Sequence, residues 1–423
     1  MSKDDSSPSS SFRLSDRLPA DPDRLDSWKE IAAYMRREVR TVQLWEKKEG
    51  LPVHRHFHKR LGSVFALRSE IESWKRQVSR FSPPLSRTRA GYHKNQSSRE
   101  AYLKGRYFWN QRSEQSLRKA IQCFELAIRE EPRCALPYSG LADSLTLLSF
   151  YEIAPSSEVM PAARRAAQRA VELDPNLAEA HASLADVFLH FDRDWPAADH
   201  EFRRSIRCNP EYALGYHWYA NLLAAHGQHE AAHRAVMQAL EINPVSIITL
   251  VWAGVTSYLA RQFEESITRY RSALELEPGF SWAHMYMAQA LEQKGSFKEA
   301  LKEFEITLQL AGGNDCVKAM KAHTYAVAGD TASARGILEE LKSTLVNQWM
   351  PSYDIAATYA ALGEPLQGIV WLNRACADHS MKLFTLTQDP RFDPLRRRSD
   401  FKDIVARIGL NRYSPAPVNF AQY

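Results

Sequence analysis

The sequence predicts a mainly α-helical solenoid of about eight helix pairs, preceded by a small basic domain that combines helices with a β-hairpin. Three observations lead to this fold class. Prolines recur 34 or 35 residues apart, small residues recur in the same frame, and the excess positive charge is confined to one short segment. A fixed period of this length is typical of stacked helical repeats, in which each repeat is one supersecondary unit.

The composition is that of an ordinary folded protein. Of the 423 residues, 44% are hydrophobic and 25% are charged, which excludes a mostly disordered chain, a collagen and a polytopic membrane protein. The five cysteines lie far apart and form no CxxC pair, so we expect buried thiols and a cytoplasmic location. Residues 1–11 lack the apolar core of a signal peptide. Residues 242–260 carry no charge but include Pro244 and several hydroxyl groups, which favours a buried helix over a membrane span.

The distribution of charge divides the chain. Residues 24–100 hold 18 basic and 8 acidic residues, whereas the net charge of the whole chain is only +5. This asymmetry predicts a nucleic-acid-binding module joined to a different domain. The predicted parts are a disordered tail (1–23), the basic domain (24–77), a linker (78–100), the helical array (101–382) and a capping helix with a tail (383–423).

Local signals define the elements of the basic domain in order. Ser27 and Glu30 have the spacing of a capping box at the start of a helix. A short turn leads to a second helix over residues 40–48, which Gly and Pro close. Residues 53–67 alternate around a turn and predict a hairpin. Ser69 then predicts the cap of a last helix.

This order of helix, turn, helix, hairpin and helix resembles the winged helix-turn-helix domains of the MerR and phage-excisionase type. The resemblance is carried by WKEIAAYM, VRTVQLWEKKEGLPVHR and GSVFALRSEIESW. Arg36 stands in the turn where this family commonly has Gly, so the geometry of that turn stays open. The resemblance implies that the second helix enters the major groove of DNA while the hairpin contacts the adjacent backbone.

The residues expected to contact DNA follow from that docking. Gln43 would read adenine and Arg40 would read guanine, while lysines on the same helix would contact phosphates. The alternative is a solvated basic surface that docks an acidic protein. The expected contacts are Arg40, Thr41, Gln43, Lys47 and Lys48 on the helix, and Arg55, Lys59 and Arg60 on the hairpin.

The helical array is predicted from three recurring positions. Each proline ends a helix, because it lacks an N–H and clashes with the preceding turn. Two helices cross closely where both carry a small side chain, and a bulky residue fills the space beside the crossing. The prolines are Pro175, Pro210, Pro244 and Pro278; the small residues are Ala185, Ala220, Gly254, Ala288, Ala322 and Ala356, then Ala232, Ser266, Ala300, Ala334 and Gly368; the bulky ones are Phe202, Val236, Tyr270, Phe304, Leu338 and Leu372.

This pattern resembles the tetratricopeptide repeat family. Eight units fit it, with an insertion in the second near residues 150–160 and a turn glycine at Gly227, Gly295, Gly329 and Gly363. Such arrays form concave binding surfaces. The units are 101–134, 135–177, 178–212, 213–246, 247–280, 281–314, 315–348 and 349–382.

The resemblance implies a groove lined by the first helix of each pair. The matching residues are mostly apolar, so we expect an apolar peptide or helix as ligand. Packing of the same residues on neighbouring repeats, or on a second copy of the chain, is the open alternative. The Lys/Asn pair with which some relatives grip a terminal carboxylate is not evident, since its nearest match, His217 with Asn221, lacks the lysine. The groove residues are Ile248, Val251, Val255, Tyr258, Trp282, Met285, Gln289, Met350 and Tyr353.

A zinc-protease motif is present but is better explained by the repeat. Residues 229–233 read HEAAH, which places two histidines on one helix face beside a glutamate. However, Ala232 is the small crossing residue of its repeat, and Val236 stands where the longer zinc motif needs Gly. Glu264 or Glu265 could supply a third ligand only from the next repeat. We therefore expect no metal, no cofactor and no enzymatic activity.

The sequence as a whole predicts a cytoplasmic DNA-binding transcriptional regulator. Its array would bind a protein or peptide partner or mediate self-association as a homodimer, without contact with a membrane. The alternative is a non-enzymatic scaffold whose basic module docks protein instead of DNA.

Overall fold

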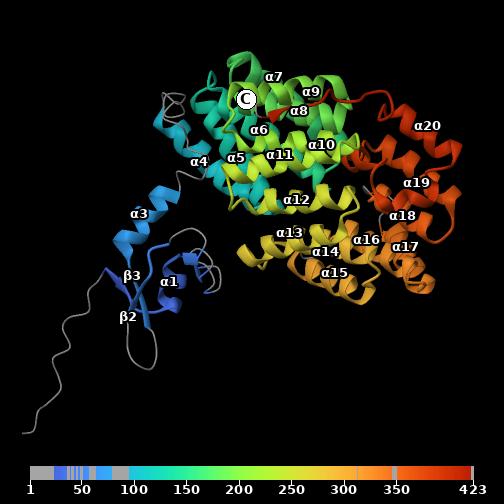
Figure 1. The fold of residues 1–423 in the computed structure, drawn as a ribbon. Coiled ribbons are helices and arrows are strands. Elements are labelled where there is room, and N and C mark those ends of the chain that lie inside the picture. Colours follow the sequence, from blue (N-terminus) through green and yellow to red (C-terminus); the bar gives the residue numbers. More distant parts are fainter. Residues whose placement is uncertain are drawn as a thin grey trace, which may run out of the picture. The chain divides into compact units, whose positions relative to one another are not determined.

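A computed structural model describes residues 23–35, 39, 42–43, 46–47, 51–56, 63–78, 95–311, 313–344 and 350–420 (Figure 1). The chain divides into two compact units, residues 1–79 and 80–423, and each is described here by itself.

The N-terminal unit contains a three-stranded antiparallel sheet with helices. The expected hairpin is present, and His54 pairs with Phe65 in its register. The sheet order is β1-β3-β2, so the sequence missed the first strand. Residues 42–43 and 46–47, within the expected second helix, are helical. The elements are β1 (Arg24–Leu25), α1 (Trp28–Met35), β2 (His54–His56), β3 (Ser63–Leu67) and α3 (Arg68–Val78).

Capping in this unit partly follows the sequence signals. The Ser27 hydroxyl accepts a hydrogen bond from the Glu30 amide at 3.2 Å, as the capping box predicts. The prediction for Ser69 was wrong, because this residue lies inside α3. The carboxylate of Asp23 instead accepts from the Ser69 amide at 3.1 Å. A side chain next to β1 therefore caps α3, an arrangement that no local spacing in the sequence reveals.

The larger unit is a stack of helix pairs. Over residues 95–377, apart from residues 312 and 345–349, eight pairs follow one another (Figure 1). The first helices are α4 (Gln96–Asn110), α6 (Ala135–Phe150), α8 (Ala178–Val187), α10 (Ala213–Ala225), α12 (Ile247–Leu259), α14 (Ser281–Gln293), α16 (Asp315–Val327) and α18 (Ser352–Ala361). The second helices are α5 (Glu114–Glu130), α7 (Ser156–Leu173), α9 (Trp195–Cys208), α11 (His229–Ile242), α13 (Phe263–Leu276), α15 (Phe297–Ala311), α17 (Thr331–Thr344) and α19 (Pro365–Ala377). Helix α4 thus begins inside the range expected to be linker.

The recurring small and bulky residues pack as the repeat pattern predicts. Ala220 and Phe202, for example, are both fully buried. Gly254 shows why the small position must be small: a Cβ atom built on it would lie 2.3 Å from Cε1 of Tyr270. No real Cβ comes so close to a ring carbon, so the aromatic ring occupies the space that a larger residue would need.

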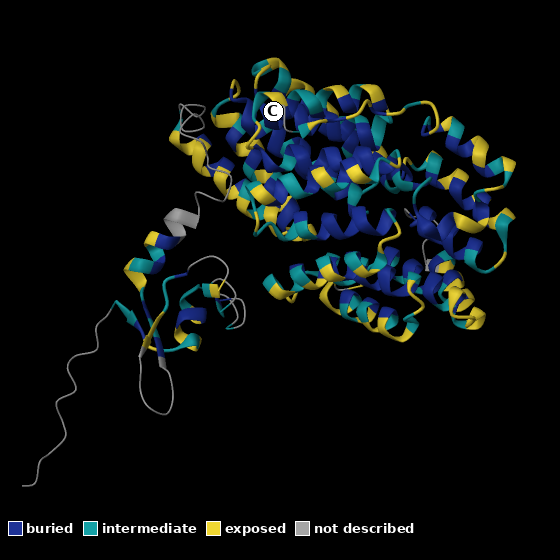
Figure 2. Cartoon of the chain, viewed as in Figure 1, coloured by how far each residue is buried: buried dark blue, intermediate teal, exposed yellow. Residues whose placement is uncertain are grey.

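Apart from α4, the first helices are buried on most sides. Figure 2 shows α12 dark blue along most of its length, and Thr249, Thr256 and Ser257 are buried with its apolar residues. A helix that is apolar all round belongs in a core, which explains the uncharged stretch noted above. No helix in the described part of the chain has the length and apolar character needed to cross a membrane.

The C-terminal region departs from the expected cap and tail. After α19 the chain forms two 3₁₀ turns, η3 (Met381–Thr385) and η4 (Pro390–Leu395), and then α20 (Ser399–Arg407). Helix α20 matches the expected capping helix. Residues 379–396, here called the C-terminal segment, instead turn back: η3 contacts α6 and α10, and η4 contacts α18. The last residues return over α9, where the Trp195 indole N–H donates to the Ile408 carbonyl at 3.1 Å.

Candidate binding site on the inner surface of the array

The residues predicted to line a groove lie mainly in the interior. Ile248 and Trp282 are half-buried, and the other seven are buried. Four of the nine come together around one small cavity of about 60 Å³: Val255, Tyr258, Gln289 and Tyr353. Met285 packs in a separate cluster with Phe304. Helices α12, α14, α16 and α18 therefore form a common inner surface around this cavity. Only part of the predicted set of groove residues lines the cavity.

The C-terminal segment covers this inner surface. Lys382, Phe384, Thr385, Asp389 and Arg391 line the same cavity as the groove residues. The phenol of Tyr353 donates to a carboxylate oxygen of Asp389 at 3.0 Å. In this structure the chain itself therefore occupies the surface on which the sequence predicted a peptide.

Buried ion pairs hold the segment in place. Asp354 on α18 is fully buried and forms ion pairs with Lys382, at 2.5 Å, and with Arg391, at 2.8 Å. Arg391 also pairs with Asp389 at 2.7 Å. Burial alone would raise the pKa of Asp389, but the charge and hydrogen bonds of Arg391 together with the Tyr353 phenol hold it below the ordinary value. The charges are thus mutually compensated, as buried charges must be.

The segment also reaches repeats that are distant in sequence. Lys382 pairs with Glu152, in the turn after α6, at 2.9 Å. Arg261, in the turn after α12, forms two parallel hydrogen bonds of 2.7 Å to the carboxylate of Asp393. Bidentate pairs of this kind combine geometric specificity with charge. The second, fifth and eighth repeats are therefore joined through one short stretch of chain.

Glu152 and Arg261 share a left-handed backbone conformation. In each helix pair, the turn between the first and second helices contains one residue at positive φ, and in four pairs that residue is not glycine. A left-handed conformation costs an L-residue roughly 1–2 kcal/mol. The sequence revealed only the glycine turns, because arginine and glutamate give no local signal of this conformation. The residues are Arg112, Glu152, Arg193, Gly227, Arg261, Gly295, Gly329 and Gly363.

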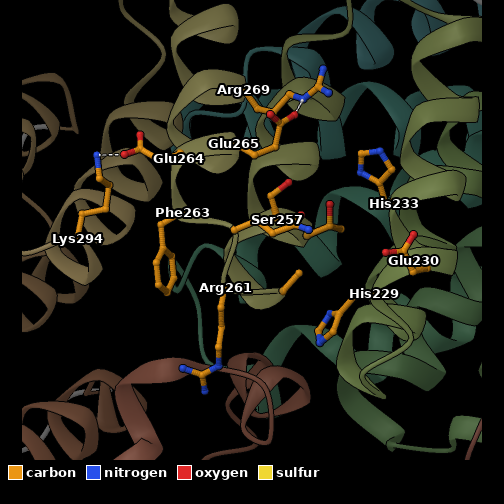
Figure 3. Close-up of a pocket in the computed structure, with 13 residues that line it drawn as sticks. His229, Glu230, His233, Ser257, Arg261, Phe263, Glu264, Glu265, Arg269 and Lys294 are labelled. Atoms are coloured by element: carbon orange, nitrogen blue, oxygen red, sulfur yellow. Dashed lines mark hydrogen bonds and ion pairs between the residues drawn. The ribbon is translucent and has the colours of Figure 1, made fainter.

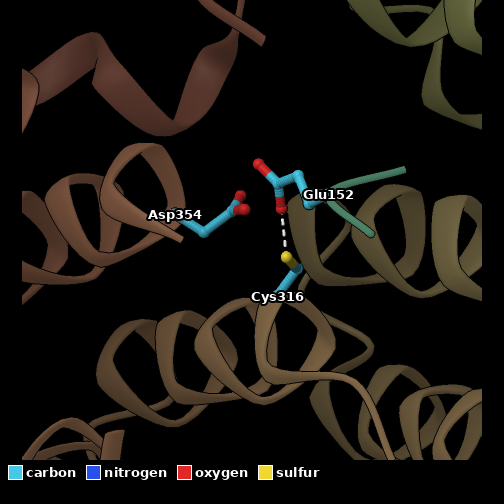
Figure 4. A group of neighbouring side chains, drawn as sticks. All are labelled: Glu152, Cys316 and Asp354. Atoms are coloured by element: carbon cyan, nitrogen blue, oxygen red, sulfur yellow. Dashed lines mark hydrogen bonds between the residues drawn. The ribbon is translucent and has the colours of Figure 1, made fainter. Parts of the chain in front are cut away.

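One cluster has the donor atoms of a metal site. Glu152, Cys316 and Asp354 bring two carboxylates and a thiol together (Figure 4). The ammonium of Lys382 contacts both carboxylates, so a cation of the protein already holds the position that a metal would take. Burial raises the pKa of the Cys316 thiol well above its ordinary value, and the thiol donates to Glu152. The cluster needs no metal for its charge balance.

The HEAAH stretch opens onto a separate pocket. Figure 3 shows His229, Glu230 and His233 of α11 on one side of it and Glu264, Glu265 and Arg269 of α13 on the other. The pocket measures about 760 Å³. Glu265 is bound to Arg269 at 2.7 Å, and Glu264 pairs with Lys294. Among the described residues, these histidines and carboxylates do not lie close enough together to form a metal site.

The predicted DNA contacts are described only in part. Gln43 is half-buried, and Lys47 and Arg55 are exposed. The guanidinium of Arg55 pairs with Glu46 at 2.6 Å, so one expected phosphate contact has a carboxylate partner within its own unit. Arg40, Thr41, Lys48, Lys59 and Arg60 lie outside the described residues, as does Arg36.

Comparison with known proteins bears on the array. The sequence model described as Tetratricopeptide repeat matches residues 201–234, which contain the second half of α9, all of α10 and the start of α11. The array has the tetratricopeptide-repeat fold. Solved structures agree with this fold: the Cut9–Hcn1 hetero-tetramer of APC/C matches 80% of this chain and 59% of its own at 15% identity, with a TM-score of 0.53.

A second solved structure also resembles the tetratricopeptide-repeat array. A monomeric variant of human IFIT1 with m7Gppp-AAAA matches 81% of this chain and 77% of its own at 14% identity, with a TM-score of 0.51. A thermophilic repeat protein of Thermus thermophilus matches 46% of this chain and 98% of its own at 17% identity, with a TM-score of 0.39. No curated protein matches the sequence significantly. Identities this low show the fold alone.

Proposed function

We propose that this chain is a non-enzymatic protein-interaction scaffold whose inner surface binds a peptide by displacing the C-terminal segment. One observation carries the proposal: residues 381–391 already lie on the inner surface as a peptide would, held by Asp354, Tyr353 and Glu152. Residues of this segment thus indicate the chemistry that the surface accepts, which is a short stretch with basic and aromatic side chains.

Two features of the segment favour its displacement by a competing peptide. The segment consists of two short 3₁₀ turns, which lack the cooperative hydrogen bonding of a long α-helix. Part of its hold comes from Arg261 and Asp393, whose side chains are 46% and 44% exposed. Exposed pairs contribute only about 0–1 kcal/mol, so loss of this pair alone costs little, whereas the fully buried Phe392 and Leu395 beside it supply most of the hold at this end. A competing peptide that carries a lysine would form ion pairs with Glu152 and Asp354 in place of Lys382.

Peptide selection with competition tests the proposal. Peptides are selected from a random library on the full chain and on Asp393→Ala, in which the bidentate pair is lost. We expect tighter capture by Asp393→Ala, enrichment of lysine or arginine in the captured peptides, and competition by a synthetic peptide of residues 379–396. Arg118→Ala is the matched control, because it removes an exposed arginine from a pair with Glu114 remote from the segment. Captured peptides that the synthetic segment fails to displace from either protein would refute the proposed surface.

A second function is favoured for the N-terminal unit by its charge and element order. The segment of residues 24–100 carries 18 basic against 8 acidic residues, and the unit places a hairpin between helices. We infer that this unit binds DNA through the exposed face that carries Lys47 and Arg55. Gel shift of the full chain on duplex DNA should show binding that weakens steeply with salt. The double substitution Lys47→Ala with Arg55→Ala should reduce this binding. No binding at low salt would leave the scaffold as the whole function.

A further inference from the structure

Arg112 is a buried arginine without a carboxylate partner among the described residues. It occupies the turn after α4, at φ 57°, and is only 5% exposed. Its guanidinium lies 3.6 Å from the centre of the Trp109 ring, and the Tyr151 hydroxyl is a hydrogen-bonding neighbour. Its Nη2 atom is buried with no hydrogen-bond partner. A charged group in this state is costly unless a ligand completes its contacts.

Arg112 differs from the neighbouring Arg106 in its electrostatic surroundings. Burial lowers the pKa of Arg112, and the neighbouring charge of Arg106 lowers it further. Arg106 itself is compensated, because it pairs with Asp143 at 3.1 Å. The two arginines therefore lie close together, and the carboxylate of Asp143 forms an ion pair with Arg106 and not with Arg112.

Arg112 lines a cavity of about 560 Å³ at the edge where the first two repeats meet the sixth and seventh. Three carboxylates also line it, and each forms an ion pair with a basic side chain. Glu114 pairs with Arg118 at 2.9 Å, Glu152 with Lys382 at 2.9 Å, and Asp315 with Lys318 at 3.2 Å. Among the described residues that line the cavity, the charge left without a counter-ion is that of Arg112.

The other walls of the cavity carry polar side chains, such as Gln111 and Asn314, and an apolar patch. Phe280, Trp282 and Leu310 form this patch, and Leu310 is 47% exposed. The Trp282 ring stacks on Tyr151 with 3.9 Å between ring centres, which fixes an aromatic wall next to the guanidinium. The cavity volume lies in the range of about 300–1,000 Å³ that is typical of small-molecule sites.

We propose that this cavity binds a small organic monocarboxylate with an apolar body. The carboxylate accepts hydrogen bonds from the Arg112 guanidinium, whose planar fork matches its geometry. The apolar body lies against Trp282 and Leu310. The neighbouring carboxylates disfavour a dianion such as phosphate, because like charges at this distance repel even when each is paired. This site shares Glu152 with the surface proposed to bind peptides, but carboxylate binding at Arg112 does not depend on that function.

Calorimetric titration of the full chain with phenylacetate tests the proposal. We expect saturable binding, no binding of the neutral isostere phenylacetamide, and weaker binding of inorganic phosphate. Arg112→Gln should lower the affinity for phenylacetate roughly tenfold to hundredfold, the range for a lost charged hydrogen bond. Arg193→Gln is the matched control, since Arg193 has the same left-handed turn position but does not line this cavity.

Several results would overturn the site: no binding of phenylacetate at millimolar concentration, equal affinity of the wild type and Arg112→Gln, equal binding of phenylacetamide, or tighter binding of phosphate. If Arg112→Gln does not fold by circular dichroism, a crystal structure of the wild type with phenylacetate replaces it. A carboxylate within hydrogen-bond distance of Arg112 supports the proposal, and a ligand bound elsewhere contradicts it.

Discussion

Lys382 donates to Glu152 at 2.9 Å across 230 positions of sequence and thereby joins the end of the repeat array to its second repeat. The same ammonium contacts Asp354, so one side chain bridges two buried carboxylates, and Arg391 supplies a second positive charge at Asp354. Burial alone would lower the pKa of Lys382, but these carboxylates raise it above the ordinary value, and the lysine stays charged. The C-terminal segment is therefore fixed by electrostatics as well as by packing.

Removing this lysine should strongly destabilise the array. We expect Lys382→Met to lower the free energy of unfolding by about 3–5 kcal/mol, because Glu152 and Asp354 lose their shared cation while still buried. Urea denaturation followed by circular dichroism measures the change. Lys342→Met is the matched control, since the half-buried Lys342 pairs with the exposed Glu339 in a contact that contributes at most about 1 kcal/mol. Equal effects of the two substitutions would show that Lys382 is solvated.

Cys316 should report the position of the C-terminal segment. Its thiol lies beside Glu152 and Asp354, which Lys382 contacts, and it donates to Glu152; burial raises its pKa, so we expect slow alkylation by iodoacetamide. Asp393→Ala should increase the alkylation rate of Cys316, because the segment opens more often. The rate at Cys134, which is also buried but lies far from the segment in sequence, should not change. Mass spectrometry of tryptic peptides separates the two sites, and parallel changes at both would indicate global unfolding instead.

Two helical glycines should respond in opposite directions to alanine. Gly254→Ala places a Cβ atom 2.3 Å from the Tyr270 ring, and we expect a loss of about 1–3 kcal/mol from overpacking. Gly336 lies inside α17 with nothing within 4 Å of an added Cβ, so Gly336→Ala should stabilise the protein by up to about 1 kcal/mol through helix propensity. Thermal denaturation compares the two variants. A stabilised Gly254→Ala would contradict the close crossing of α12 and α13.

His217 should make the protein sensitive to mild acid. Burial, and then the charge of Arg112, lower its pKa from 6.5 to about 3 in the folded state. A depressed pKa contributes stability above pH 6.5, and this stability is lost as the pH falls from 6.5 towards 3, by up to about 1.4 kcal/mol per pH unit. His217→Gln should flatten the slope of unfolding free energy over this range. Equal slopes for wild type and His217→Gln would place His217 in contact with solvent.

The array could be predicted because its signals are local and periodic. Small and bulky residues such as Gly254 and Tyr270 recur at the spacing that helix crossing requires, and the structure buries them. The C-terminal segment gave no such signal, because its 3₁₀ turns have no period and its partners lie far away in sequence, as Asp393 and Arg261 do. The non-glycine residues in left-handed turns, such as Arg112, were also missed, because arginine and glutamate give no local signal of this conformation. The function of the predicted groove residues stays a prediction.

Hydrogen exchange of the full chain tests the central claim most directly. Backbone amides of residues 379–396 are followed by mass spectrometry with and without a peptide selected on the inner surface. If the segment occupies that surface and is displaced by a partner, it should be protected in the free protein and exchange faster when the peptide binds, while α12 and α18 stay protected. Rapid exchange of the segment in the free protein, or unchanged protection at saturating peptide, would contradict the account.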